Sequence, residues 1–303
     1  MGDVDLTVPF VRLAQENLFL VPGSLTLSRY ESMLSDSSFN DAASGNRRGY
    51  LDTSAIDRYL NFRGIEDGVD IFVIDSSPSL GALNRVLLLG ADFFVVPMMA
   101  DAFSVQGVEN LGLQLERWKR NWLMTARALA RDPKSGIDNS EVLQGECLFL
   151  GYIVNNFRDS CKMMKSEVHF EHCSEPYWGT VNEGRRNGRG VRILQESLNV
   201  YSGKTIQRQD EWRQKIPLKV KEFLSEKHCK NGLVNTSWPT PLGNIQDSGQ
   251  LTAISMELCK AVQFLTPQDD PKLNLVGTRE LAEKARVEFE SLGDNLLGLV
   301  LRY

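Results

Sequence analysis

The chain alternates short runs of consecutive apolar residues with longer segments in which apolar residues recur every three or four positions. Consecutive apolar residues are typical of strands covered on both faces, and the longer spacing is typical of amphipathic helices. The predicted strands are 17–22, 69–75, 92–97 and 147–155. The predicted helices are 27–34, 53–62, 80–89, 105–118, 251–264 and 278–292. This alternation predicts an α/β fold of three layers, with a mostly parallel sheet between helices.

Three stretches depart from that alternation. Residues 35–49 are rich in Ser, Asn, Asp, Gly and Arg, and we expect a mobile loop there. Beyond Asn156 the chain turns polar and arginine-rich, and residues 233–245 hold two prolines in an expected strand-to-loop connection. We therefore expect one α/β domain over residues 1–270, with a basic insert at about 157–232, and a helical extension over 271–303.

Composition adds a local charge asymmetry to this picture. The 303 residues are 42% hydrophobic and 24% charged, which is typical of a folded, soluble protein. The net charge of -5 excludes a uniformly basic nucleic-acid coat, but residues 184–230 hold 12 Lys and Arg against 5 Asp and Glu. We interpret this basic stretch either as a solvated face or as a contact to nucleic-acid phosphates.

The cysteines and the apolar runs indicate a compartment. Five cysteines, an odd number without a C-x-x-C pair, argue against a disulfide framework and favour a reducing cytoplasm. The first twenty residues lack the pattern of a signal peptide. The longest apolar run, residues 86–99, contains Asp92 and is shorter than the roughly 20 residues that a membrane span needs. We therefore expect a cytoplasmic protein without a membrane partner.

Asp75 is the principal candidate for chemistry, because it ends the strongest of the predicted strands. Ligands of open α/β sheets collect outside the carboxyl ends of the strands. A carboxylate at that place either faces Mg²⁺ or its water, as in phosphate-handling folds, or caps the following helix. The strand alone does not distinguish the Mg²⁺ carboxylate from the helix cap.

A longer motif surrounds Asp75. The residues 70–81, Asp-Ile-Phe-Val-Ile-Asp-Ser-Ser-Pro-Ser-Leu-Gly, are followed by Ala-Asp-Phe-Phe-Val-Val-Pro at 91–97 and Val-Gln-Gly-Val at 105–108. Together they resemble the Walker B region of the ParA/MinD-type partition ATPases. Gly151-Tyr-Ile-Val-Asn155 looks like the family's G-x-x-x-N strand, and Trp238-Pro-Thr-Pro-Leu-Gly243 is similar to a later base-side loop. The resemblance is continuous only over residues 69–118.

The resemblance implies ATP and Mg²⁺ as cofactors and a set of site residues. Asp75 would hold Mg²⁺ through water as the catalytic carboxylate, and Ser76 and Pro78 would belong to a turn that senses the γ-phosphate. Asn155 would contact the adenine base, together with the loop residues Pro241, Leu242 and Gly243. The resemblance further implies a homodimer, nonspecific binding of DNA on the nucleoid and a ParB-like adaptor. We assign the DNA contact to four arginines of the basic stretch, Arg185, Arg186, Arg189 and Arg192.

One family motif does not occur in the sequence. The deviant Walker A loop, K-G-G-x-G-K-[ST], is missing, and the tripeptide Gly203-Lys204-Thr205 lies after the Walker B strand and lacks the required upstream glycine. Without loop amides and lysines the γ-phosphate has no cradle, so Asp75 alone cannot catalyse. We therefore expect an amino-terminally shortened chain without ATPase activity, whose sheet exposes unpaired apolar edges.

Other readings of the sequence compete with this one. A non-catalytic interaction module on the same scaffold is the main alternative for function, and a DNA-binding accessory protein is a further one. His169, His172 and Cys173 suggest zinc, but a fourth ligand at motif spacing is missing, which favours a solvated turn. Ser76 and Ser77 lack a nucleophile-elbow motif, and they indicate a turn and a helix cap instead.

Overall fold

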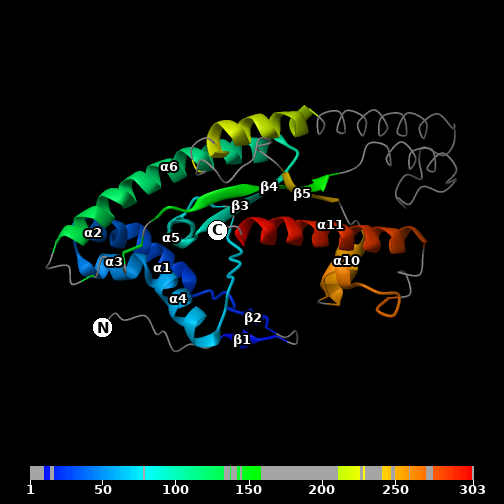
Figure 1. Cartoon of the computed structure of the whole chain (residues 1–303), viewed down its shortest axis with the longest axis horizontal. Helices are drawn as coiled ribbons and strands as arrows, with labels where there is room; N and C mark the ends of the chain where they lie inside the picture. Colours follow the sequence, from blue (N-terminus) through cyan, green and yellow to red (C-terminus); the bar gives the residue numbers. More distant parts are fainter. Residues whose placement is uncertain are drawn as a thin grey trace, which may run out of the picture. The chain divides into compact units, whose positions relative to one another are not determined.

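The computed structural model describes two compact units of the chain. The described residues are 10–13, 17–77, 79–132, 137, 142–143, 145–157, 211–225, 228, 241–246, 250–258, 260–270 and 276–301. The first unit draws on residues 1–94, 110–149 and 226–233, and the second on 95–109, 150–225 and 234–303. Figure 1 labels the helices and strands of both units.

The structure contains a three-stranded sheet in the order β3-β4-β5. Its strands are β3 (Phe93–Met99), β4 (Leu148–Phe157) and β5 (Pro241–Gln246). β4 and β5 pair in parallel, with Tyr152 opposite Pro241 and Asn155 opposite Ile245. A sheet with a parallel strand pair, accompanied in the chain by helices, confirms the predicted α/β class.

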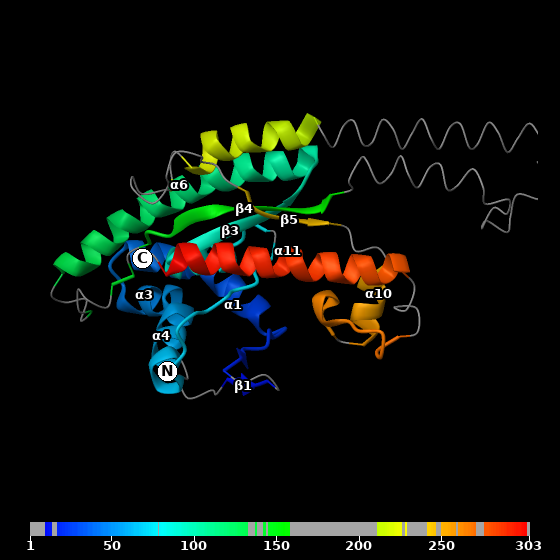
Figure 2. The same cartoon turned by 45° about the vertical axis from the view of Figure 1, so that its right-hand side comes forward.

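The second unit buries one face of a long carboxyl-terminal helix against β5. Helix α11 (Val276–Val300) packs Leu292 against Leu242 and Ile245, and Figures 1 and 2 show it alongside the strand. Asn295 of α11 donates a hydrogen bond to the Leu242 carbonyl oxygen at 2.8 Å. Helix α10 (Gln250–Glu257) and the 3-10 turn η6 (Val262–Phe264) form a smaller cluster around Leu251.

The first unit is mainly helical, also where the sequence suggested a loop. Its helical elements are α1 (Leu27–Met33), the π-helical turn η1 (Leu34–Ser38), α2 (Phe39–Ala43), α3 (Arg47–Thr53), α4 (Ala55–Asp67) and α5 (Ala82–Gly90). The long helix α6 (Ala102–Arg131) contributes most of its length to the same unit. The predicted mobile loop at 35–49 is therefore wrong.

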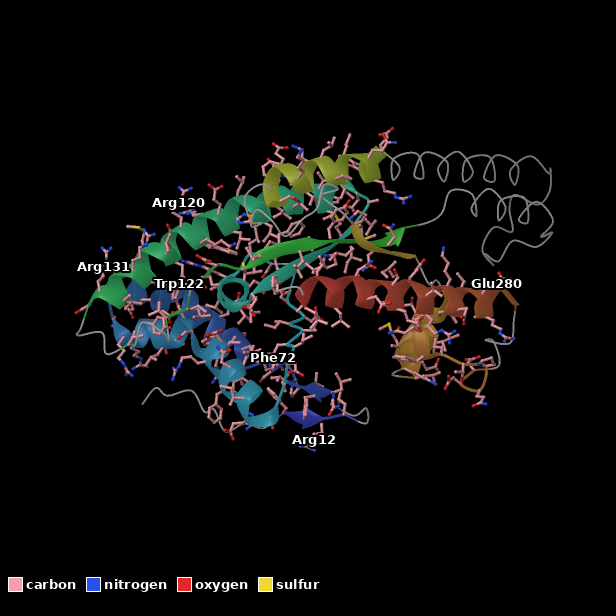
Figure 3. All side chains as sticks on the ribbon, viewed as in Figure 1. Arg12, Phe72, Arg120, Trp122, Arg131 and Glu280 are labelled. Atoms are coloured by element: carbon pink, nitrogen blue, oxygen red, sulfur yellow. The ribbon has the colours of Figure 1, made fainter. Side chains whose placement is uncertain are left out.

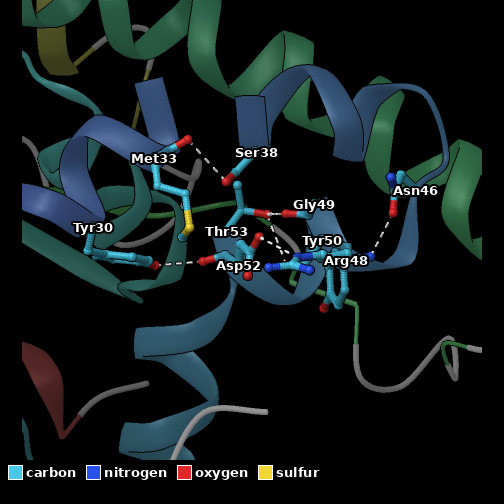
Figure 4. Close-up of polar contacts among 9 residues, drawn as sticks. All are labelled: Tyr30, Met33, Ser38, Asn46, Arg48, Gly49, Tyr50, Asp52 and Thr53. Carbon is cyan, nitrogen blue, oxygen red and sulfur yellow. Dashed lines mark hydrogen bonds and ion pairs between the residues drawn. The ribbon is translucent and has the colours of Figure 1, made fainter. Parts of the chain in front are cut away.

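Side-chain hydrogen bonds to the backbone hold the turns between α1 and α4 (Figure 4). The Asn46 side chain accepts from the Arg48 N–H at 2.9 Å and caps α3, and the Thr53 hydroxyl donates to the Gly49 carbonyl at 2.7 Å. Tyr30 of α1 donates to the carbonyl of Asp52 at 2.6 Å. Asn46, which lies in the predicted loop, thus serves as a helix cap.

Trp122 of α6 lies at the centre of the first unit's core (Figure 3). Its ring stacks on Tyr50 with the centroids 6.2 Å apart, and its indole N–H donates to the Leu143 carbonyl at 2.7 Å. The Tyr50 hydroxyl accepts from the Leu143 N–H at 3.1 Å. The remaining buried members of this cluster are Ala42 of α2, Leu89 of α5, Ala126 and Leu129 of α6, and Val142, which lies outside these helices.

The strand predicted at 69–75 is the largest departure from the sequence-based picture. Residues 69–77 are described without strand structure. Among the described residues, no backbone group of 70–76 makes a hydrogen bond. Val73 is 92% exposed, and Ile71 and Ile74 are also exposed. The prediction fails because an apolar run is buried in a sheet only where strands pair with it on both sides.

A second predicted strand is shorter than expected. Of residues 17–22 only β2 (Phe19–Leu20) is a strand, and it pairs antiparallel with β1 (Val11–Arg12). Leu20 and Val21 are exposed, so the predicted burial is wrong as well. Two short strands cannot bury their own faces, which explains the exposure.

Candidate functional site

The turn that follows Asp75 is fixed by one residue of the next helix. Asn84, buried on α5, donates from its side-chain amide to the carbonyl oxygens of Ser77 at 2.5 Å and Ser79 at 2.6 Å. The hydroxyls of Ser77 and Ser79 lie 2.9 Å apart. These bonds set the conformation of the turn between the apolar segment and α5, as predicted. The predicted helix cap is wrong, because the N-cap of α5 is Gly81 and no side chain caps the helix.

Asn84 is the residue of this site that the sequence analysis missed. Its signal was present, because Asn84 stands as a polar residue among apolar neighbours on a predicted helix. A buried polar side chain needs hydrogen-bond partners, and the carbonyl oxygens of the preceding turn provide them for Asn84.

Asp75 and Ser76 are exposed at the end of the apolar segment. Within the described part of the chain, Asp75 has neither a hydrogen bond nor an ion pair. Pro78 lies outside the described residues. The carboxylate is therefore accessible, but no described side chain orients it.

The predicted base contacts lie in the second unit. Asn155 is an exposed residue of β4. Pro241, Leu242 and Gly243 are the first residues of β5 and not a loop, and Leu242 is buried against α11. Pairing of β4 with β5 brings Asn155 and Pro241–Gly243 onto neighbouring strands.

The close pairing of these two strands depends on Gly151. Its φ is +156°, and a Cβ at this position would lie 2.7 Å from Cγ of Leu242. Only glycine permits this approach without displacement of the Leu242 side chain. The glycine of the G-x-x-x-N motif thus has a packing role in the structure.

Asp57 of α4 is a further titratable group near the start of β3. Burial raises its pKa to about 6, and the charge of Asp92 adds to the shift while a hydrogen bond from Asn61 opposes it. Asp57 also lies against Gly90 at the end of α5. The group therefore links helices α4 and α5, which flank the apolar segment in the sequence.

Several predicted candidates fall on residues outside the description. They are Arg185, Arg186, Arg189, Arg192, His169, His172, Cys173 and the tripeptide 203–205. Of the cysteines, Cys147 is described, and it is free and buried. Burial raises the pKa of its thiol to about 11.

The described residues do not form a site for Mg-ATP by themselves. Asp75 is the single carboxylate at the turn, and the described part of the chain contains no cluster of three or more His, Cys, Asp or Glu that could hold a metal ion. The amide of Asn84 is already used by the turn. The printed sequence also lacks the lysines and glycines of a phosphate-binding loop.

The described helices were also compared with the length and apolarity that a membrane span requires. Even α6 and α11, the long helices of this part, are not apolar enough over a sufficient length to cross a membrane.

Comparisons with known proteins show a family match for the amino-terminal part of the chain. Residues 4–126 match the family model described as an AAA domain. The chain is 25% identical over 96 residues to the virulence plasmid ParA family protein pGP5-D of Chlamydia psittaci, and the match spans 32% of each protein. It also resembles a solved structure, protein DIP2308 of Corynebacterium diphtheriae, with 24% identity and a TM-score of 0.44 over 50% of this chain and 53% of that one.

Proposed function

We propose that the protein is a partition-type ATPase relative, because residues 4–126 match the AAA domain model and 96 residues are similar to a ParA family protein. In its intact form it binds Mg-ATP, dimerises and binds DNA nonspecifically, and so positions a plasmid or chromosome in the cytoplasm. A ParB-like adaptor is the expected partner. The observation that carries the proposal is the family match, which includes Asp75, the turn held by Asn84 and strand β3.

The proposal assigns the nucleotide chemistry to the intact protein and not to the printed residues alone. Asp75 supplies a carboxylate of the kind that binds Mg²⁺ through water, and Ser76 and Pro78 follow it in the turn. Asn155 and the start of β5 supply amide and backbone groups on adjacent strands. A phosphate-binding loop must complete this set, since phosphoryl transfer depends on positioning and charge neutralisation.

Calorimetric titration with Mg-ATP tests the proposal. The 303-residue chain should show no measurable binding, whereas a longer form with an in-frame K-G-G-x-G-K-[ST] segment should bind. In that longer form Asp75→Asn should weaken Mg²⁺-dependent binding by about tenfold, as expected for the loss of one charged ligand. The matched control is Asp70→Asn, which changes a carboxylate at the other end of the apolar segment. Equal binding with and without Asp75 would contradict the assignment.

DNA binding is tested separately on the basic stretch. Gel retention at about 50 to 200 mM salt should show binding that weakens steeply with salt, because released counterions drive the association. Replacing Arg185, Arg186, Arg189 and Arg192 by Ala should lower the slope of log K against log salt by about 1 for each phosphate that is no longer neutralised. A quadruple Ala variant of Arg47, Arg48, Arg120 and Arg127 serves as a control of equal charge.

A second candidate function is the non-catalytic interaction module. Exposure of the unpaired apolar segment 70–76 favours it, because large exposed apolar patches mark interaction sites. The module requires no nucleotide. If even the loop-bearing form failed to bind Mg-ATP, this function would replace the first.

A further inference from the structure

Arg85 of α5 is a partly buried cation without a negative partner. Its guanidinium carbon lies 3.6 Å from the centroid of the Phe39 ring of α2, so the planar group stacks on an aromatic face. The Nε atom of Arg85 is buried and has no hydrogen-bond partner. Within the described part of the chain Arg85 forms no ion pair either. A charge that is withdrawn from water and left unpaired is costly, so this arginine calls for an explanation.

Arg117 of α6 brings a second positive charge close to Arg85. Leu89 of α5 and Trp122 of α6 pack in one hydrophobic cluster, and the two arginines stand about one helical turn before them. The pKa of Arg85 is lowered to about 10, first by burial and then by the charge of Arg117. Both observations place the two guanidinium groups near each other, and we call them the arginine pair.

No described carboxylate neutralises the arginine pair. Arg117 is exposed and, among the described residues, takes part in no ion pair. Glu116, its neighbour on α6, pairs with Arg120 instead, with Oε1 and Nη2 2.9 Å apart. Two unpaired like charges repel each other, so an anion that binds both of them is favoured.

The terminal nitrogens of Arg85 are available to such an anion. Of the side-chain nitrogens of Arg85, Nε is the one that is buried without a partner. Because Phe39 covers a face of the guanidinium group, the N–H donors point outward in the plane of that group. A guanidinium group can bind two oxygens of a phosphate through parallel hydrogen bonds. The stack on Phe39 therefore holds these donors in one orientation.

We propose that Arg85 and Arg117 form a binding site for a phosphate oxyanion, in which the guanidinium group stacked on Phe39 donates hydrogen bonds and Arg117 adds a second positive charge. A phosphate group carries about −1.5 to −2 charges at neutral pH and thus matches two cations, whereas a carboxylate brings a single charge. The ligand is inorganic phosphate or a small phosphate monoester. The site uses neither Asp75 nor a nucleotide, so the inference goes beyond the proposed ATPase function.

Calorimetric titration of the full chain with sodium phosphate tests the site, at neutral pH in EDTA, with the ionic strength held constant by NaCl. Arg85→Gln and Arg117→Gln should each lower the association constant about tenfold, because each removes a charged contact. The matched control is Arg120→Gln, which removes an exposed arginine of α6 that pairs with Glu116 (Figure 3). This control should change the constant by less than about twofold. Equal affinity of all three variants would overturn the proposal.

Two further titrations identify the class of the ligand. Sodium acetate should bind at least about tenfold more weakly than phosphate, and acetate binding as tight as phosphate binding would contradict a phosphate site. Glycerol phosphate distinguishes the two sources of the group. Binding tighter than that of inorganic phosphate indicates a monoester, and weaker binding indicates the free ion, provided that Arg85→Gln weakens both. Glycerol phosphate and phosphate binding that are insensitive to Arg85→Gln would overturn the site.

Nuclear magnetic resonance of the unmodified chain keeps the test independent of how the variants fold. The Nε–Hε signal of Arg85, assigned by its loss in Arg85→Lys, should shift when phosphate is added, and that of Arg120 should not. An unshifted Arg85 signal at phosphate concentrations that saturate the calorimetric titration would contradict the proposal.

Thermal unfolding separates a binding role from a structural one. Without phosphate, Arg117→Gln should raise the midpoint of unfolding, because it removes repulsion within the arginine pair. Phosphate should raise the midpoint of the parent chain and have little effect on this variant. A lower midpoint of Arg117→Gln with an unchanged phosphate response would show that the pair is structural, and the proposal would fail. Since no experiment on the pair contains ATP or Mg²⁺, a failed nucleotide titration leaves these results unaffected.

Discussion

Strand β4 and the apolar segment are alike in sequence and opposite in structure. Both are runs of apolar residues that lead to a polar side chain, Asn155 in one and Asp75 in the other. In β4 the residues Phe149, Tyr152 and Val154 are buried and the backbone pairs with β5. The apolar segment has neither burial nor pairing. Apolar composition therefore predicts a tendency to be covered, and only the available neighbours decide whether a strand forms.

The largest effect on stability is expected in the helical core of the first unit. This core forms although the apolar segment is not part of a sheet. Trp122→Ala should lower the free energy of unfolding by about 3–5 kcal/mol, since it removes the ring that stacks on Tyr50 and leaves a cavity. Urea unfolding followed by circular dichroism measures it. Trp122→Phe is the control, with a smaller loss from the unpaired Leu143 carbonyl. A loss below about 1 kcal/mol for Trp122→Ala would show that this cluster is not the core.

Paired strands should also be sensitive to small additions at their close contacts. Gly151→Ala should destabilise the chain by about 2–4 kcal/mol, because φ is +156° and the new Cβ would overlap Leu242. Gly68→Ala is the matched control before the apolar segment. Gly68 has φ +65° but nothing within 4 Å, so it should lose only about 1 kcal/mol from left-handed backbone strain. Equal losses in urea unfolding would mean that β4 and β5 do not approach as described.

The sequence predicted the elements that depend on local hydrophobic periodicity. Helix α5, the central part of α6 and strands β3 and β4 follow from periodicity, and the position of Asp75 after an apolar run follows as well. The helices of 35–53 did not follow, because their Ser, Asn and Asp residues favour turns. There tertiary contacts override propensity, since Phe39, Tyr50 and Leu51 pack on the Trp122 cluster. The contact between Tyr50 and Trp122 joins residues far apart in the chain, and no single-sequence pattern indicates such a pair.

The pH dependence of stability tests the burial of Asp57, which joins α4 to α5 on either side of the apolar segment in the sequence. The pKa of Asp57 is raised to about 6 from 3.8, so between these pH values the folded chain binds more protons than the unfolded one. Stability from this group is therefore fully present below about pH 4 and is lost as the pH rises through about 6. Asp57→Asn should remove this loss, and the variant should be more stable than the parent at neutral pH. Unfolding curves of both proteins from about pH 4 to 8 that stay parallel would contradict the burial of Asp57.

The smallest expected effect compares the same substitution in both regions. Val73→Thr should change the free energy of unfolding by less than about 0.5 kcal/mol, because the side chain is exposed and a hydroxyl there remains in water. Val154→Thr in β4 should lose about 1–3 kcal/mol, since its hydroxyl would be buried. Thermal and urea unfolding of the two variants measure the difference. If Val73→Thr were as destabilising as Val154→Thr, the segment would already be covered in solution, and its pairing partner would have to come from within the chain.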